Sequence, residues 1–178
     1  MLACEQTSGM NMMQHGASVY ETFRDLKNHI LTGSDLAGEW KMPEWVSSPK
    51  LWAHLLDEQV VEEYQLFHDC GKPFCRVVDD EGKQHFPDHA ATSEKIWREI
   101  GGDDQIAKLI GMDMDIHLLK DEGIAEFASR QEAATLLLTG LAEVHSNAKM
   151  FGGIDSTSFK IKWKHIDKRG KKIVALLA

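Results

Sequence analysis

The apolar residues in most of the chain recur every three or four positions, which is the spacing of one face of an α-helix. This pattern predicts a helix over residues 15–31. A second helix is expected from Pro49 to about Gly71, because proline is favoured in the first turn of a helix. Further helices are predicted over residues 88–100, 105–110 and 133–148. The last of these is apolar on most sides, which predicts a central, buried helix.

Two other segments alternate between apolar and polar residues, as strands do. Residues 74–86 contain two such runs around a turn at 79–82 and predict a small β-hairpin. In the tail, apolar positions alternate with lysines, which predicts a second hairpin over residues 157–178 with one basic face. Residues 1–13 are polar and rich in methionine, and we expect them to be loosely held. The sequence therefore predicts a mainly α fold with two small hairpins.

Size and composition place these elements in one folded domain. The chain has 178 residues, of which 43% are hydrophobic and 27% charged, as in ordinary globular proteins. We expect a single domain over residues 1–178, with a helical core over 14–150 and the basic C-terminal hairpin over 157–178. No apolar run reaches the roughly 18–20 residues that span a bilayer, and no export signal is visible. Three cysteines without a CxxC pair favour a reducing compartment, so we expect a cytoplasmic protein without membrane contact.

The charge is distributed unevenly along the chain. The net charge is −8, whereas residues 159–178 hold seven basic residues and one acid, so that the remainder carries −14. An acidic body argues against tight binding of a nucleic-acid duplex. The basic hairpin could still contact a phosphate-bearing ligand, including a short single-stranded nucleic acid.

The run His68-Asp69-Cys70-Gly71-Lys72 carries the clearest chemistry. A histidine and an aspartate stand together where an apolar helix is expected to end. Imidazole and carboxylate together suit Mn, Fe, Zn, Co or Ni better than Ca, and the two oxygens of Asp69 can bridge two ions. Gly71 allows a sharp turn of the chain. Lys72 can then face the site, where an ammonium group beside a metal would hold a phosphate.

This run resembles the HD superfamily of metal-dependent phosphohydrolases, which is defined by an adjacent His-Asp pair on a helix, often continued as H-D-x-G-K. Downstream, Lys72-Pro73, the expected hairpin and the run from His85 to His89 are similar to the HD domain of bacterial tRNA nucleotidyltransferases. Those domains have a Gly-His pair where this chain has Asp88-His89. The resemblance implies an HD-domain helical bundle with a small hairpin after the motif.

The resemblance also implies a set of metal ligands. A distant first histidine maps to His15, with His54 and His29 as rivals. His54 precedes His68 by fourteen residues, and on one helix that separation is about 21 Å, too far to share a metal. The late acidic ligand is expected on the helix over residues 133–148, where Glu143 takes the place of the family's usual aspartate. His145 is its competitor.

Many members of the family hold a second ion with histidines from the middle of the chain. His89 fits one such position, and Asp113 or His117 could supply another, although the family's paired histidines are absent here. We therefore expect one or two divalent ions, of Mn, Fe, Co, Ni, Zn or Mg. The expected ligands are His15, His68, Asp69, His89, Asp113, His117 and Glu143.

The implied reaction is hydrolysis of a nucleotide or nucleotide-derived phosphoester by metal-activated water. Asp69 is expected to orient the nucleophile, Lys72 to neutralise the phosphate oxygens, and His89 to protonate the leaving group. Two alternatives remain open. One is a di-iron oxygenase of HD fold, resembling inositol oxygenase, and the missing paired histidines count against it. The other is a non-catalytic HD-fold binding or scaffold protein, which the replaced ligands favour.

Overall fold

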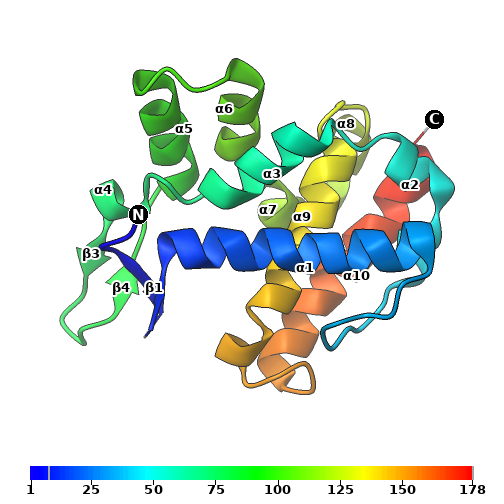
Figure 1. The fold of residues 1–178 in the computed structure, drawn as a ribbon, viewed down its shortest axis with the longest axis horizontal. Helices are drawn as coiled ribbons and strands as arrows, with labels where there is room; N and C mark the ends of the chain where they lie inside the picture. Colours follow the sequence, from blue (N-terminus) through cyan, green and yellow to red (C-terminus); the bar gives the residue numbers. More distant parts are fainter. Residues whose placement is uncertain (8, 178) are drawn as a thin grey trace. The chain divides into compact units, whose positions relative to one another are not determined.

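The computed structural model describes residues 1–7 and 9–177, which are mainly helical with two small antiparallel two-stranded sheets (Figure 1). The mainly α fold predicted from the sequence is therefore confirmed. The chain divides into two units. The first consists of Met1–Ala17 and Glu58–Met114, and the second of Ser18–Asp57 and Asp115–Ala178. One domain over residues 1–178 stays a prediction.

The first unit contains both sheets and the shorter helices around them. Strand β1 (Glu5–Thr7) pairs with β2 (Met10–Asn11), and α1 (Met12–Thr32) follows at once, contributing its residues 12–17 to this unit. The remaining elements are α3 (Glu58–Phe67), α4 (Lys72–Cys75), β3 (Val77–Val78), β4 (Gln84–His85), α5 (His89–Glu99) and α6 (Asp104–Gly111). Strands β3 and β4 form the hairpin predicted over residues 74–86. Helices α5 and α6 lie side by side (Figure 1).

The N-terminal residues are more ordered than their composition suggests. We predicted that residues 1–13 would be loosely held, and this prediction is wrong for the part that the structure describes. The β1–β2 hairpin is tied down because the N–H of Met12 donates to the Cys4 carbonyl at 3.0 Å. The side chains of Cys4 and Met12 are both buried. Two apolar anchors therefore hold a segment that polar residues dominate.

The second unit is built around two long helices. Residues 18–32 of α1 belong to it, with the 3-10 helix η1 (Glu44–Ser47) and α2 (Pro49–Ala53). The later elements are α7 (Asp115–Leu118), η2 (Asp121–Gly123), α8 (Ile124–Ala128), α9 (Ala133–Ser146), η3 (Ala148–Phe151) and α10 (Thr157–Leu176). Helix α9 is buried along most of its length, as its apolar sequence predicts. Helix α10 packs against α8 and α9.

The helix predicted from Pro49 to Gly71 is in fact two helices, α2 and α3. The break falls at residues 54–57. There the N–H of Leu56 donates to Thr135 Oγ1 at 3.2 Å instead of to a helical carbonyl. The apolar spacing continues across the break, which is why the sequence pattern reads as one helix.

The C-terminal segment is a helix, so the basic hairpin predicted over residues 157–178 is wrong. Ser156 caps α10 by accepting the N–H of Phe159 at 3.1 Å. The buried residues are Phe159, Ile166, Gly170 and Ile173, which share one helical face. At Gly170 the helix approaches Trp45 so closely that a β carbon would lie 2.2 Å from Trp45 Cε2. Phe159, Ile161 and Trp163 alternate with polar residues as in a strand. Over the twenty residues of α10, however, the buried positions follow the helical period.

Across residues 1–7 and 9–177, no helix combines the length and the apolar character that crossing a membrane requires.

Candidate metal centre

The first turn of α1 carries His15 into the interior of the first unit, where the side chain is fully buried. The next residue is Gly16, and a β carbon there would lie 2.3 Å from the Leu66 carbonyl oxygen. Because glycine lacks this atom, the start of α1 can lie directly against the end of α3. The ring centroids of His15 and His68 are consequently 5.2 Å apart.

His68 follows the last residue of α3, and its orientation is set by the helix end. Its Nδ1 lies 2.8 Å from the Gln65 carbonyl oxygen. A carbonyl can only accept, so Nδ1 carries a proton, and Nε2 is the nitrogen left to face other partners. Nε2 faces Asp69 and lies 3.4 Å from its Oδ2. This is the arrangement in which a histidine with one nitrogen bonded to a backbone carbonyl offers the other to a metal.

The carboxylate of Asp69 is buried and surrounded by nitrogen atoms. Oδ2 lies 3.6 Å from His15 Nε2 and 2.6 Å from Lys72 Nζ. Burial is the largest influence on the pKa of Asp69 and raises it. The charges of His68, Lys72 and His15, with the hydrogen bond from Lys72, outweigh burial and bring the pKa below its usual value. Asp69 is therefore an anion at neutral pH.

One nitrogen of His15, one of His68 and one oxygen of Asp69 all lie within 4.8 Å of one another, and all three residues are buried. This group could hold a metal ion. Within the described residues, Oδ1 of Asp69 is buried and accepts no hydrogen bond, so the carboxylate keeps capacity for a cation. Two imidazoles and one carboxylate form a donor set that suits Mn, Fe, Co, Ni or Zn.

Lys72, the first residue of α4, is the cation of the site. Besides the 2.6 Å contact with Asp69, its Nζ donates to Gln6 Oε1 at 2.9 Å and lies 5.5 Å from the centre of the Phe86 ring. The side chain is 9% exposed, so its charge is largely desolvated and depends on these partners. Sequence reasoning missed Gln6, because nothing in a segment expected to be loose marks it as a site residue.

The position of Gly71 requires a glycine because the backbone near Ser93 packs closely against it, and not because of its backbone angles. The sequence predicts a sharp turn there, yet its φ is −85°, which any residue adopts. A β carbon would instead lie 2.3 Å from the Ser93 backbone nitrogen, and the N–H of Gly71 donates to Ser93 Oγ at 2.9 Å. The neighbouring Cys70 is buried, and burial raises the pKa of its thiol to about 11. The thiol stays protonated and is a packing group, as its isolated position in the sequence indicates.

Helix α5 begins with His89, whose Nδ1 donates to the Phe86 carbonyl at 3.1 Å. Its Nε2 lies 3.8 Å from Asp69 Oδ1, whereas Lys72 contacts the other oxygen, Oδ2. The preceding residue, Asp88, has φ 51° and ψ 30°, in the left-handed region. The structure thus brings His89 to the site together with His15, His68, Asp69 and Lys72.

Asp113 is buried in the same unit, where its Oδ1 accepts the hydroxyl of Tyr64 at 2.6 Å. The Tyr64 ring in turn stands edge-on to His68, with the ring centroids 6.5 Å apart. The structure therefore connects Asp113 to the site through a tyrosine that the sequence did not single out. A role for Asp113 as a metal ligand stays a prediction.

The other predicted ligands belong to the second unit. His117 on α7 and Glu143 on α9 form a pair, with Nε2 and Oε2 2.9 Å apart. Their part in a metal centre stays a prediction. The rivals His54 and His29 also lie in this unit, where each places Nδ1 2.8 Å from a carbonyl oxygen within five residues of itself.

His145 is a buried histidine with both ring nitrogens hydrogen-bonded, as in a structural role. Its Nδ1 donates to the Leu141 carbonyl at 2.9 Å, and its Nε2 accepts the N–H of Lys41 at 3.2 Å. The ring also stacks on Trp40 with the centroids 4.1 Å apart. Burial lowers the pKa of His145 to about 4, against smaller opposing effects of its two backbone hydrogen bonds. Both ring nitrogens are used, which excludes His145 as a ligand in this arrangement.

Five ionisable side chains from three parts of the sequence thus meet in the first unit, and three of them form a possible metal-binding group. The HD resemblance predicts this meeting, and membership of that family stays a prediction. No protein-family model, no curated protein and no solved structure matches the chain.

Proposed function

We propose that the chain is a metal-dependent phosphohydrolase that cleaves a nucleotide or a nucleotide-derived phosphoester. The observation that carries this proposal is the buried group of His15, His68 and Asp69 with Lys72 beside it. Two imidazoles and an ionised carboxylate suit a divalent cation, and an adjacent ammonium group suits the phosphate of a substrate. The motif H-D-x-G-K, on which the resemblance to the HD superfamily rests, contributes three of these four residues.

In this proposal His15, His68 and Asp69 hold the divalent ion. When bound, the ion would supply Lewis acidity, which lowers the pKa of coordinated water and polarises the phosphoryl group. Mn, Fe, Co, Ni, Zn and Mg are the candidates. The described group of three ligands favours one ion. If a second ion binds, His89 and Asp113 are its candidate ligands in the first unit. His117 and Glu143, the other ligands predicted from the sequence, belong to the second unit.

The other residues of the site bind substrate and move a proton. Lys72 neutralises an oxygen of the phosphoryl group, and Gln6 fixes the position of its Nζ through the 2.9 Å hydrogen bond. His89 has Nδ1 committed to the Phe86 carbonyl, so a protonated Nε2 can donate to the leaving oxygen. The side chain of His89 is 17% exposed, whereas Asp69 is 1% exposed, so His89 faces the side from which substrate can enter.

One observation favours a non-catalytic alternative. Lys72 already neutralises Asp69 at 2.6 Å, and this buried pair could stabilise the fold without any metal. A binding or scaffold protein would then keep the arrangement for structural reasons. The two functions differ in a simple property, because only the phosphohydrolase takes up a stoichiometric divalent ion and turns over substrate.

A hydrolysis screen with metal analysis separates them. The metal-free protein is incubated with Mn²⁺, Co²⁺, Ni²⁺, Zn²⁺ or Mg²⁺ and with nucleoside mono-, di- and triphosphates and cyclic nucleotides. We expect phosphate release or phosphodiester cleavage with at least one ion. Oxygen uptake by the iron-loaded protein tests the di-iron oxygenase. Absence of both metal uptake and hydrolysis under all conditions would leave the scaffold function.

The decisive variant is Asp69→Ala. We expect it to lower the hydrolysis rate by about 10³-fold or more and to abolish metal binding, because the anionic ligand is removed. The matched control is Asp79→Ala, since Asp79 pairs with His85 at 2.6 Å in the same unit but on the surface. Circular dichroism checks that both variants fold. Normal turnover and metal content in Asp69→Ala would refute the assignment.

A further inference from the structure

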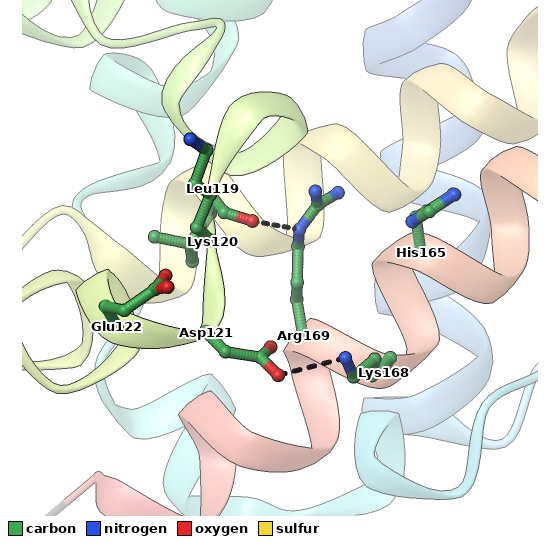
Figure 2. A pocket seen from close by; sticks show the side chains of 7 residues that line it. All are labelled: Leu119, Lys120, Asp121, Glu122, His165, Lys168 and Arg169. Atoms are coloured by element: carbon green, nitrogen blue, oxygen red, sulfur yellow. Dashed lines mark hydrogen bonds and ion pairs between the residues drawn. The ribbon is translucent and has the colours of Figure 1, made fainter.

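A second candidate binding site lies in the second unit and shares no residue with the group proposed to hold a metal. A pocket of about 350 Å³ opens between residues 119–122 and helix α10. His165, Lys168 and Arg169 line it from the helix, and Figure 2 shows Lys168 directed towards Asp121 and Arg169 towards Leu119. Its volume is at the lower end of the range for small-molecule sites, which is about 300–1,000 Å³.

Arg169 is the central group of this pocket. Its Nε donates to the Leu119 carbonyl at 2.8 Å, which fixes the plane of the guanidinium group. In Figure 2 the two terminal nitrogens point away from α10, along the segment that carries Leu119 and on the side facing His165. Among the described residues, Arg169 forms no ion pair with a carboxylate. A guanidinium held at one nitrogen presents its remaining donors as a planar fork, which matches two oxygens of a phosphate.

The charge around Arg169 is incompletely balanced. Partial burial lowers the pKa of the guanidinium, and the nearby Asp121 offsets this only in part. Asp121 is itself engaged by Lys168 at 3.0 Å and by Lys172 at 2.9 Å. Glu122 is the other acid of the lining, which also includes Lys120. A partly desolvated cation with no carboxylate partner is stabilised when an anion binds.

The positive charges of helix α10 produce an electrostatic potential around the pocket that favours anions. Its cationic side chains lie on the exposed part of the helix, while the opposite face packs on the protein. Four of the lysines, Lys160, Lys168, Lys171 and Lys172, are paired with acids, whereas Lys162 and Lys164 form no ion pair within the described residues. The basic face that the sequence places on a strand is therefore present on a helix. Such a face attracts anions towards the pocket and makes their binding salt-dependent.

We propose that this pocket binds the phosphate group of a small phosphorylated molecule, with Arg169 as the bidentate donor and Lys168 and His165 beside it. The small volume favours a single phosphate or a mononucleotide over a polymer. Because the site belongs to the second unit, the proposal does not depend on metal binding by His15, His68 and Asp69.

The test is a calorimetric titration of the full chain with inorganic phosphate and with adenosine monophosphate. The protein is kept in a chelator, which keeps divalent ions from the metal centre, and at constant ionic strength. We expect saturable binding of both probes. Arg169→Gln should weaken it by about tenfold, because two charge-assisted hydrogen bonds are lost. Arg169→Lys should weaken it too, since lysine keeps the charge but lacks the fork.

The matched control is Lys164→Gln, which removes one positive charge from the same exposed face of α10 outside the pocket. We expect this control to change affinity by no more than about twofold. Circular dichroism checks the fold, and His165→Gln serves as a second pocket variant if Arg169→Gln unfolds. Equal losses in Arg169→Gln and Lys164→Gln, or no saturable phosphate binding, would overturn the proposal. Binding of a short oligothymidylate without binding of either probe would also overturn it, in favour of a diffuse nucleic-acid surface.

Discussion

His68 in the first unit and His145 in the second are both buried histidines whose Nδ1 donates to a carbonyl oxygen in the same turn. They differ at the other nitrogen. Nε2 of His145 accepts a backbone N–H from Lys41, whereas Nε2 of His68 faces the ionised carboxylate of Asp69. His145 thus belongs to a neutral, apolar core, and His68 belongs to a cluster of charges. Burial alone therefore does not separate a structural histidine from a candidate metal ligand, but the partner of Nε2 does.

The largest effect that we expect concerns His145, the structural histidine of this comparison, and acid denaturation measures it. An ordinary histidine has a pKa of 6.5, and in the folded chain the pKa of His145 is about 4. Between these values the unfolded chain takes up a proton that the folded chain does not. The contribution of His145 to stability is thus complete above pH 6.5 and declines as the pH falls to about 4, by roughly 3 kcal/mol. His145→Gln should remove this part of the pH dependence.

Urea denaturation at pH 7.0 and at lower pH values, followed by circular dichroism in a chelator, measures the effect. Comparing variant with wild type cancels the contributions of the other histidines. His54→Gln is the control, because His54 is exposed and also bonds a carbonyl in its own turn. If His145→Gln and wild type lose stability in parallel as the pH falls, the buried neutral state assigned to His145 is wrong.

A smaller effect is expected at Gly16, where the close approach of α1 and α3 brings His15 beside His68. Gly16→Ala introduces a β carbon 2.3 Å from a backbone carbonyl oxygen, so α1 must move away from α3. We expect a loss of about 1–3 kcal/mol in the free energy of unfolding. Because His15 moves with α1, Mn²⁺ affinity should fall by roughly tenfold.

The control for helix propensity is Gly111→Ala. The new β carbon there meets Glu94 Oε2, at the end of a flexible side chain that can move aside. Thermal denaturation and calorimetric titration with Mn²⁺ compare the two variants. Similar stability and affinity in both would mean that the close approach at Gly16 does not position His15.

The smallest effect concerns the lysine in the charged cluster. Lys72 Nζ lies 2.6 Å from Asp69 Oδ2, so its ammonium group competes with a divalent ion for the same oxygen. Lys72→Met should raise Mn²⁺ affinity by about tenfold, while the KM for a phosphorylated substrate increases because a phosphate partner is lost. Lys95→Met is the control, since Lys95 pairs with Glu99 on the surface. An unchanged Mn²⁺ affinity would show that Lys72 does not share the carboxylate with the ion.

Local patterns predicted much of the fold. Helical spacing identified α1 and α9, and the turn at residues 79–82 identified the β3–β4 hairpin. The same method failed for α10, because alternation over a few residues is compatible with a strand while Ile166 and Ile173 reveal the helical face only over longer stretches. It also missed the break between α2 and α3, where the N–H of Leu56 donates to Thr135, a residue distant in sequence.

The sequence predicted only those site residues that belong to a recognisable motif. His68, Asp69 and Lys72 stand in one run, and His89 follows the hairpin at a recognisable point. The resemblance to the HD superfamily added His15. Gln6 and Tyr64 carry no such signal. Gln6 reaches Lys72 because two buried side chains anchor a polar hairpin, and Tyr64 reaches Asp113 across forty-nine positions of sequence. Contacts of this kind follow from tertiary packing, which periodicity does not encode.

The left-handed backbone at Asp88 has a consequence for how such a chain is compared with others. Glycine adopts this conformation without strain, and aspartate is among the few other residues that do so readily. Asp and Gly can therefore exchange at this position while the path of the main chain, and with it the start of the next helix, is preserved. An alignment that scores residue identity counts Asp against Gly as a mismatch at such a position, although the main chain can follow the same path with either residue.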